Sequence, residues 1–267
     1  MTRLPVNKTY KLYIGGQFPR SESGRTYPVA DGVWAVLGSR KDLRDAVKAA
    51  RGALAGWSGK TAYNRAQILY RVAEMMEGRR AQFVDLGAPE AEVEAAVDRW
   101  VWYAGWADKI QHVTGSANPV AGPFFNFTVP EPVGVVGVVA PDQPSLLGLV
   151  SRLAPALVAG NTTVVVASET SPLPAVTLAE VLATSDVPGG VVNLLTGRKA
   201  ELTPWLAGHM DVDSIDVTGL TPELAGRAGE LAADSVKRVV RGDPAEESPY
   251  VVTAFMEMKT VWHPIGT

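Results

Sequence analysis

The hydrophobic positions of the chain are densest between residues 131 and 172. Val133–Ala140 contains small and β-branched residues with no polar interruption, which is typical of a parallel strand covered on both faces. A turn with two prolines follows, then apolar residues at helical spacing, with Ser145 placed to cap that helix. A Gly-Asn pair ends the helix, and Thr162–Val166 predicts a second strand. The pattern therefore predicts a strand–helix–strand unit with a right-handed crossover.

Helical periodicity dominates the residues before this unit. Lys11–Phe18 contains a Gly-Gly pair and predicts a small hairpin. Three amphipathic helices are predicted after it, over Asp42–Trp57, Ala62–Glu77 and Glu90–Asp108. The last of them carries four aromatic side chains, which could form a ligand-stacking surface. We expect packing instead, because aromatic residues at helical spacing mostly lie in a core or an interface; they are Trp100, Trp102, Tyr103 and Trp106.

Helices and strands alternate after the central unit. The pattern predicts a helix over Pro172–Ala183, a buried strand over Val191–Leu195 and a short helix over Leu202–His209. Asp211–Gly219 is predicted to be another strand with its turn, and Leu224–Val240 a further helix. This alternation favours an α/β fold with a mostly parallel, Rossmann-like sheet.

Two further segments favour an extended β arm. Phe124–Val129 is aromatic and β-rich, and Tyr250–Trp262 is predicted to be one strand. Residues 241–249 between the last helix and this strand are polar and turn-rich, which indicates a linker. We expect the two strands to pair in space and to be covered by another chain, since an apolar edge strand is otherwise an association hazard.

Composition limits the classes of partner. The 267 residues are 46% hydrophobic and 20% charged, with a formal net charge of −3, which gives no reason to expect nucleic acid or an anionic membrane as partner. No apolar run approaches the roughly 20 residues of a spanning helix, and no signal peptide is visible after Met1. We therefore expect a cytoplasmic protein.

The chain contains no cysteine, which excludes disulfides, cysteine–metal sites and a thiolate nucleophile within these residues. The three histidines, at positions 112, 209 and 263, show no metal-binding spacing. No Gly-x-Ser-x-Gly elbow and no phosphate-binding loop sequence is present. Common catalytic motifs are therefore absent from the sequence.

Several stretches are similar to one known family. EPVGVVGVVAP at 131–141 and ALVAGNTTVVVASETSP at 156–172 resemble the cofactor-domain signature of the aldehyde dehydrogenase superfamily, as do YAGWADKIQ at 103–111 and VPGGVVNLLTG at 187–197. MKTVW at 258–262 resembles its carboxyl-terminal oligomerisation strand. The resemblance implies an NAD-binding-like Rossmann domain in residues 1–123 and 131–240 and an oligomerisation arm in 124–130 and 250–264. Residues 241–249 would then be a linker that replaces the catalytic domain.

The resemblance also marks a cofactor position and its losses. Pro141, Ser168, Glu169, Thr218 and Gly219 stand where family members bind the dinucleotide, and we expect them to form a vestigial site. Four other positions depart from the family pattern. They are Gln143 in place of an oxyanion-donating asparagine, Val166 in place of a ribose-binding lysine, Leu220 in place of a pyrophosphate-binding serine, and Lys199 in place of a glycine. Lys199 and its neighbour Arg198 could attract a phosphate, although exposed loop lysines usually bind nothing specific.

The family's chemistry is missing from this chain. Aldehyde dehydrogenases form a thiohemiacetal and then a thioester on a cysteine, and this chain has none. At the place of the family's general-base glutamate the chain has Arg241–Pro244, and the nearby Glu246 and Glu247 are expected to be a solvated linker pair. We therefore expect no catalysis by the family mechanism.

Three functional hypotheses remain at this stage. The first is a non-catalytic subunit that pairs with itself or with a full-length aldehyde dehydrogenase through Phe124–Val129 and Tyr250–Trp262. It requires no cofactor, although weak NAD(P) binding stays possible. The second is an NAD(P)-binding oxidoreductase or cofactor sensor, and the third is a complete dehydrogenase with another nucleophile.

Overall fold

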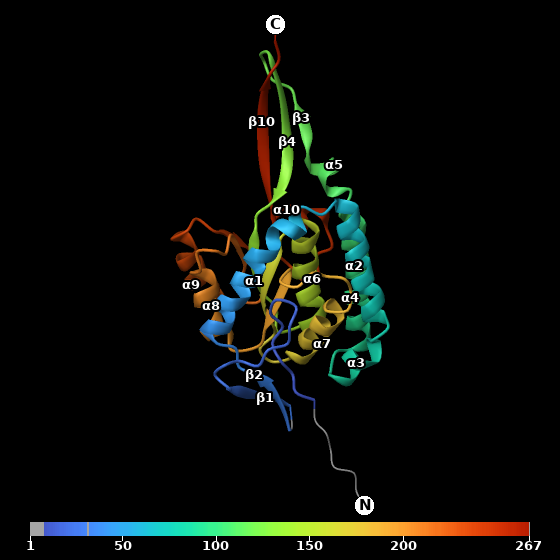
Figure 1. Ribbon diagram of the computed structural model, residues 1–267, viewed down its shortest axis with the longest axis vertical. Coiled ribbons are helices and arrows are strands. Elements are labelled where there is room, and N and C mark those ends of the chain that lie inside the picture. Colours follow the sequence, from blue (N-terminus) through green and yellow to red (C-terminus); the bar gives the residue numbers. More distant parts are fainter. Residues whose placement is uncertain (1–7, 31, 267) are drawn as a thin grey trace, which may run out of the picture.

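The computed structural model describes residues 8–30 and 32–266 and shows an α/β body from which a β arm projects (Figure 1). A five-stranded, wholly parallel sheet lies at the centre of the body, in the order β7-β6-β5-β8-β9. The predicted parallel sheet is confirmed. Its strands are β5 (Val135–Val139), β6 (Thr162–Val166), β7 (Val192–Leu195), β8 (Ser214–Asp216) and β9 (Arg238–Val240).

Helices cover both faces of this sheet. One face carries α1 (Arg40–Ser58), α8 (Lys199–Ala207) and α9 (Pro222–Ala233). The opposite face carries α2 (Ala62–Glu77), α4 (Glu90–Trp106), α6 (Ser145–Val158) and α7 (Leu173–Leu182). The shorter helices are α3 (Arg80–Asp85), α5 (Ile110–Thr114) and α10 (Pro249–Thr253). Figure 1 shows the two helical layers on either side of the strands.

The central strand β5 explains the uninterrupted apolar run in the sequence. Successive side chains of a strand point to opposite faces, so a strand covered on both faces needs apolar residues at every position. Val136 and Val138 belong to the core beneath α6, and Val135 and Val139 belong to the core beneath α1 and α8. All four are fully buried.

The predicted aromatic packing on α4 is also confirmed. Trp100 and Tyr103 are fully buried, and Trp102 and Trp106 are partly buried against the same core. The aromatic cluster is therefore part of the body's interior.

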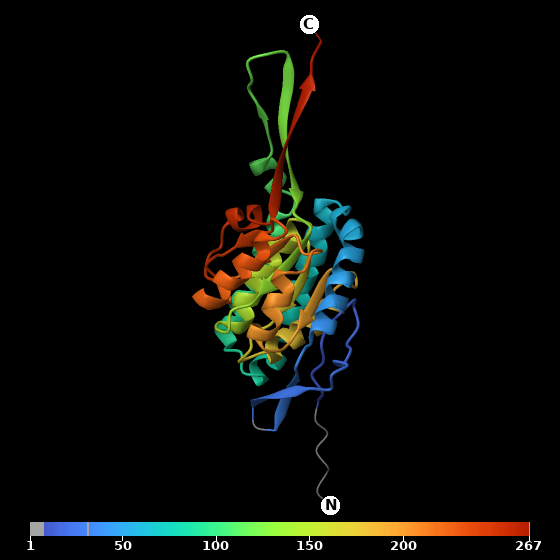
Figure 2. The same ribbon diagram turned by 90° about the vertical axis from the view of Figure 1, so that its left-hand side faces the viewer.

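A long two-stranded ribbon forms most of the arm. Strand β4 (Phe124–Pro132) pairs antiparallel with β10 (Met256–Pro264) along the full length of both, and β3 (Ser116–Asn118) adds a short third strand. The pairing of these two segments is confirmed, whereas the third strand was not predicted. Figure 2 shows the arm standing clear of the body.

Two predicted elements are wrong. Tyr250–Trp262 is not one strand, because Pro249 and the capping hydroxyl of Ser248 start helix α10 before β10 begins at Met256. Leu224–Val240 is not one helix either. Helix α9 ends at Ala233, Val236 adopts a left-handed φ of 53°, and the chain turns into β9, whose backbone pairs with β8.

The amino-terminal segment lies along the β7 edge of the central five-stranded sheet. Ile14 and Gln17 pair across Gly15-Gly16, which confirms the predicted turn, but Tyr13 also pairs antiparallel with Leu194 of β7. A second hairpin, made of β1 (Thr26–Ala30) and β2 (Val33–Val36), was not predicted. The segment thus covers the β7 edge of the sheet.

Candidate cofactor-binding crevice

The strand order creates a crevice at the carboxyl edge of the sheet. The chain proceeds from β5 towards β7 on one side and then returns to place β8 on the other side of β5. Ligands of open α/β sheets bind at such a reversal, outside the carboxyl ends of the strands. Pro141 follows β5, Ser168 and Glu169 follow β6, and Thr218 and Gly219 follow β8, so all five predicted residues lie at this edge. Their role in cofactor binding stays a prediction.

Asp142 connects two of the loops at this edge. Its Oδ1 accepts hydrogen bonds from the backbone N–H of Glu169 at 2.7 Å and from the Ser168 hydroxyl at 3.2 Å. The Lys199 ammonium lies 3.0 Å from the same oxygen. Burial opposes ionisation, but the hydrogen bond and charge of Lys199 outweigh it and lower the pKa of the Asp142 carboxyl. Gln143, the predicted substitute for an oxyanion donor, is exposed.

Lys199 bridges the crevice. Besides Asp142 in the loop after β5, its Nζ donates to the carbonyl oxygen of Gly219 in the loop after β8, at 2.9 Å. The expectation of an exposed loop lysine is wrong, because Lys199 begins α8 and only 5% of it is exposed. Burial lowers its pKa, and the carboxylate of Asp142 partly offsets that effect. An internal cation thus spans the point where the strand order reverses.

The carboxylate of Glu169 has internal partners. Arg198 Nη1 donates to Oε1 at 2.8 Å, and the backbone N–H of Lys199 donates to Oε2 at 2.9 Å. The carboxylate therefore sits at the amino terminus of α8, where a negative charge is favourable. The sequence indicated Glu169 as a ribose acceptor; in the structure these bonds use both of its oxygens.

The amino terminus of α6 also has an internal anion. Glu92 of α4 accepts from the backbone N–H groups of Leu146 at 2.7 Å and Leu147 at 3.1 Å through Oε1. The expected cap by Ser145 is wrong: Pro144 is the N-cap residue and Ser145 the first helical residue. The helix start that could attract a phosphate is thus neutralised from within.

The turn after β8 is tightly packed. A side chain on Gly219 would lie 2.1 Å from the carbonyl oxygen of Ala140, so this position tolerates only glycine. Thr218 Oγ1 accepts from the backbone N–H of Gly242 at 3.0 Å, which attaches the first residues of the linker to the crevice. Thr221 caps α9, since its side chain accepts from the backbone N–H of Leu224.

A buried ion pair lies next to the crevice. Arg152 of α6 donates to the carboxylate of Asp216 in β8 at 2.6 Å, and both side chains are at most 2% exposed. Gly242 passes directly over the guanidinium, since a β-carbon there would lie 2.4 Å from Arg152 Nη1. Neither residue stood out in the sequence.

Arg99 fixes the rest of the linker. From α4 it donates to the carbonyl oxygens of Pro244, Ala245 and Glu246 and to the carboxylate of Glu247, at 2.9–3.3 Å. Its guanidinium also donates to Ser151 at 2.7 Å. Glu246 and Glu247 are both exposed, as expected, although Glu247 is also paired with Arg99. Residues 241–249 form an attached strap across α4 and α6.

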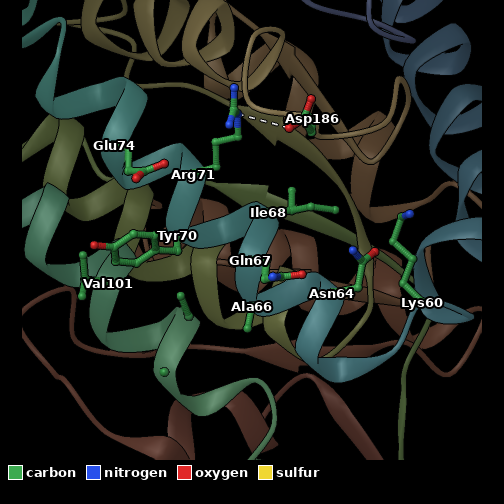
Figure 3. A pocket seen from close by; sticks show the side chains of 12 residues that line it. Lys60, Asn64, Ala66, Gln67, Ile68, Tyr70, Arg71, Glu74, Val101 and Asp186 are labelled. Carbon is green, nitrogen blue, oxygen red and sulfur yellow. Dashed lines mark ion pairs between the residues drawn. The ribbon is translucent and has the colours of Figure 1, made fainter.

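Other parts of the described surface offer fewer groups that could bind a metal or a ligand. No group of three potential metal ligands occurs in residues 8–30 and 32–266. A surface groove of about 810 Å³ lies along α2, and Figure 3 shows Arg71 reaching from this helix towards Asp186. Their ion pair measures 3.1 Å between Nε and Oδ2, so these two charges of the groove neutralise each other.

A sequence model of the aldehyde dehydrogenase family matches residues 26–261. The chain belongs to this family. Human aldehyde dehydrogenase 1A1 is 31% identical over 273 residues, which cover 95% of this chain and 54% of that protein. Aldehyde dehydrogenase family 2 member B4 from Arabidopsis thaliana is 34% identical, over 91% of this chain and 48% of its own length. The aldehyde dehydrogenase homologue therefore spans about half the length of the curated relatives it matches.

Solved structures of family members share the fold. The NAD⁺ complex of an aldehyde dehydrogenase from Bacillus cereus superposes with a TM-score of 0.80 at 26% identity, covering 87% of this chain and 50% of that one. HpcC from Thermus thermophilus gives a TM-score of 0.82 at 32% identity, covering 87% and 47%. A structurally similar relative therefore binds NAD⁺ on this fold.

In the crevice of the present homologue, several groups that could contact a dinucleotide are bonded to other parts of the chain. A bound NAD(P) needs a carboxylate open to its ribose and backbone N–H groups open to its phosphates. Here Glu169 bonds to Arg198 and α8, Glu92 bonds to the start of α6, and Lys199 spans the crevice. In the described part of the chain, none of the helices is long and apolar enough to cross a membrane.

Proposed function

We propose that the chain is a non-catalytic aldehyde dehydrogenase-like subunit that acts by assembling with itself or with a full-length aldehyde dehydrogenase. One observation carries the proposal: the chain keeps an intact, apolar β arm while none of its 267 residues is a cysteine. The arm supports assembly, and the missing thiolate removes the family's nucleophile. The cytoplasmic location stays a prediction.

The edge of β10 is the surface that would bind the partner. In the three-stranded sheet β10 pairs with β4 on one side only, so its outer backbone groups are open to another strand. Three apolar side chains on this strand are 41–58% exposed: Met258, Val261 and Trp262. Strand addition supplies main-chain hydrogen bonds, and exposed apolar side chains add burial.

The internal contacts of the crevice support a role without a cofactor. A subunit that need not bind NAD(P) can use its charged side chains to hold its own loops together. Lys199, Asp142 and Glu169 do this at the carboxyl edge of the sheet. We propose that NAD(P) binds weakly or not at all.

Light scattering coupled to size-exclusion chromatography tests the assembly. The native chain should elute as a dimer, or as a mixed complex when co-expressed with a full-length aldehyde dehydrogenase. Val261→Lys combined with Trp262→Lys places one charge on each face of β10 and should prevent assembly. The matched control is Trp34→Lys on β2, at the opposite end of the molecule from the arm (Figure 1). A native chain that stays monomeric in both settings contradicts the proposal.

The second candidate function is an NAD(P) sensor or oxidoreductase. It is favoured by the structural similarity to an NAD⁺ complex. Titration calorimetry with NAD⁺ and NADP⁺ separates the two candidates. We expect no heat at millimolar dinucleotide for the native chain, and binding to appear in Lys199→Gly, which clears the crevice. Tight binding by the native chain, or turnover of an aldehyde, would favour the sensor or the enzyme.

A further inference from the structure

A groove of about 930 Å³ lies where three helices meet on one face of the body. The first turn of α1, the end of α8 and the end of α9 form its walls. Its volume falls within the range of small-molecule sites, which is roughly 300–1,000 Å³. Lys199 does not line the groove: Pro204, the first residue of α8 that does, is five residues further along the helix, about 7.5 Å at 1.5 Å each, so the groove is separate from the crevice.

The lining of the groove is mainly apolar. Leu43, Pro204 and Leu231 belong to it, together with Trp205 and Met210. Trp205 is 47% exposed and Met210 is 73% exposed, which is high for side chains of this size. Exposed large apolar side chains gathered in a concave surface indicate binding of an apolar group.

One cation at the rim has no anionic partner. The Arg40 guanidinium lies 4.1 Å from the centre of the Trp205 ring and forms no ion pair with any residue in the described ranges. Its neighbours differ, because Lys41 pairs with Glu22 and Arg44 pairs with Asp45.

The remaining charges do not neutralise Arg40. Asp234 is the acidic residue of the lining and stands on the α9 wall, against three cations on the α1 wall. His209 uses Nδ1 to accept from the backbone N–H of Asp211 at 3.2 Å. The rim by α1 therefore keeps an unmatched positive charge.

We propose that this groove binds a small amphipathic carboxylate, with its apolar body against Trp205 and its carboxylate on Arg40. A guanidinium stacked on an aromatic ring keeps its N–H groups in the guanidinium plane, where a carboxylate accepts two of them. The apolar walls then cover the rest of the ligand. The inference does not depend on assembly through the arm or on NAD(P).

Titration calorimetry with 2-naphthoate tests the site, with naphthalene-2-carboxamide as its uncharged counterpart. The native chain should bind 2-naphthoate with a submillimolar dissociation constant and the amide about tenfold more weakly, as expected for one charge-assisted contact. Arg40→Gln should weaken the binding of 2-naphthoate by a similar factor and leave the affinity for the amide unchanged. Trp205→Ala should weaken both.

Two controls keep the result specific. Arg227→Gln removes an exposed arginine of α9, and Trp34→Ala removes an exposed tryptophan of β2; neither residue lines the groove, so neither variant should change either affinity. Circular dichroism of each variant checks folding. Absence of binding to the native chain, equal binding of acid and amide, or loss of binding in a control variant overturns the proposal.

Discussion

Strands β5 and β10 both carry apolar side chains but have opposite surroundings. All five residues of β5 are buried between two helical layers. Of the nine residues of β10, only Met256 at its base is buried. The body therefore covers its own strand, whereas the arm leaves its apolar side chains without cover from this chain.

The charged side chains of the two regions also differ in burial. In the body, Arg152, Arg99 and Lys199 are almost completely buried and each has a matched acceptor. In the arm, the ion pair of Lys259 with Glu131 is exposed. Buried charged side chains with matched acceptors stabilise a single structure, whereas exposed ion pairs leave a surface accessible. The difference supports the proposal that the arm is the surface for assembly.

The largest effect is expected inside the body. Arg152→Met leaves the Asp216 carboxylate buried without its partner, which typically costs about 3–5 kcal/mol of unfolding free energy. Urea denaturation measures the change. Arg44→Met, which removes the exposed partner of Asp45, should cost less than about 0.5 kcal/mol. Equal losses in the two variants would remove the contrast between buried and exposed charges.

The next largest effect is a change of the unfolding free energy with pH. Burial raises the pKa of the Tyr103 phenol to about 12. An unfolded tyrosine loses its proton near pH 10, so between pH 10 and 12 the folded chain binds more protons and the unfolding free energy falls as pH rises. Two pKa units correspond to at most about 2.7 kcal/mol.

Tyr103→Phe removes this dependence and isolates its size. The buried hydroxyl has no hydrogen-bond partner among the described residues, so the variant should match or slightly exceed native stability at pH 8. Urea denaturation at pH 8 and pH 11.5 should then show the native chain losing stability relative to the variant. Parallel losses would contradict burial of the phenol.

A smaller effect is expected where the strap joins the body. Arg99→Met removes its contacts with the linker backbone and with Glu247, at a cost of about 2 kcal/mol. Hydrogen exchange should increase in residues 241–249 and remain unchanged in β5. Arg71→Met, whose partner Asp186 is exposed, is the control. Unchanged exchange in the strap would show that Arg99 does not hold it.

The smallest effect on unfolding is expected in the arm. Val261→Lys with Trp262→Lys alters side chains that this chain covers only in part, so the unfolding free energy of an isolated chain should change by less than about 1 kcal/mol. The same variant should lose assembly. Urea denaturation at a concentration where the chain is monomeric measures the first quantity. A loss of several kcal/mol would mean that the arm stabilises the body.

The sequence predicted elements well where one local pattern determined them. The predicted segments Thr162–Val166 and Ala62–Glu77 match β6 and α2 at both ends, because turn residues or capping groups mark where their apolar patterns begin and end. Tyr250–Ala254 was wrongly predicted to be part of a strand, because a short apolar run is compatible with both the helical and the strand period. The end of α9 was missed because Val236, a β-branched residue, adopts a left-handed backbone there.

The candidate site was predictable in position but not in its bonding. The places of Pro141, Ser168, Glu169, Thr218 and Gly219 follow from the strand ends, which the apolar runs mark. The bridge between Asp142 and Lys199 joins residues 57 positions apart by number, so it follows only from the fold. A signal was present nonetheless, because Lys199 replaces a family glycine at this edge of the sheet.

The register of the arm has a consequence for the order of events during synthesis. Thr128 of β4 contacts Thr260 of β10 across 132 positions of sequence. Every helix and strand of the body is translated before β10 leaves the ribosome, and closing such a long loop is entropically costly until its ends are already held near each other. The folded body provides that proximity. The surface proposed for assembly is therefore completed after the body, so a nascent chain presents it only once the strands and helices of the body have been made.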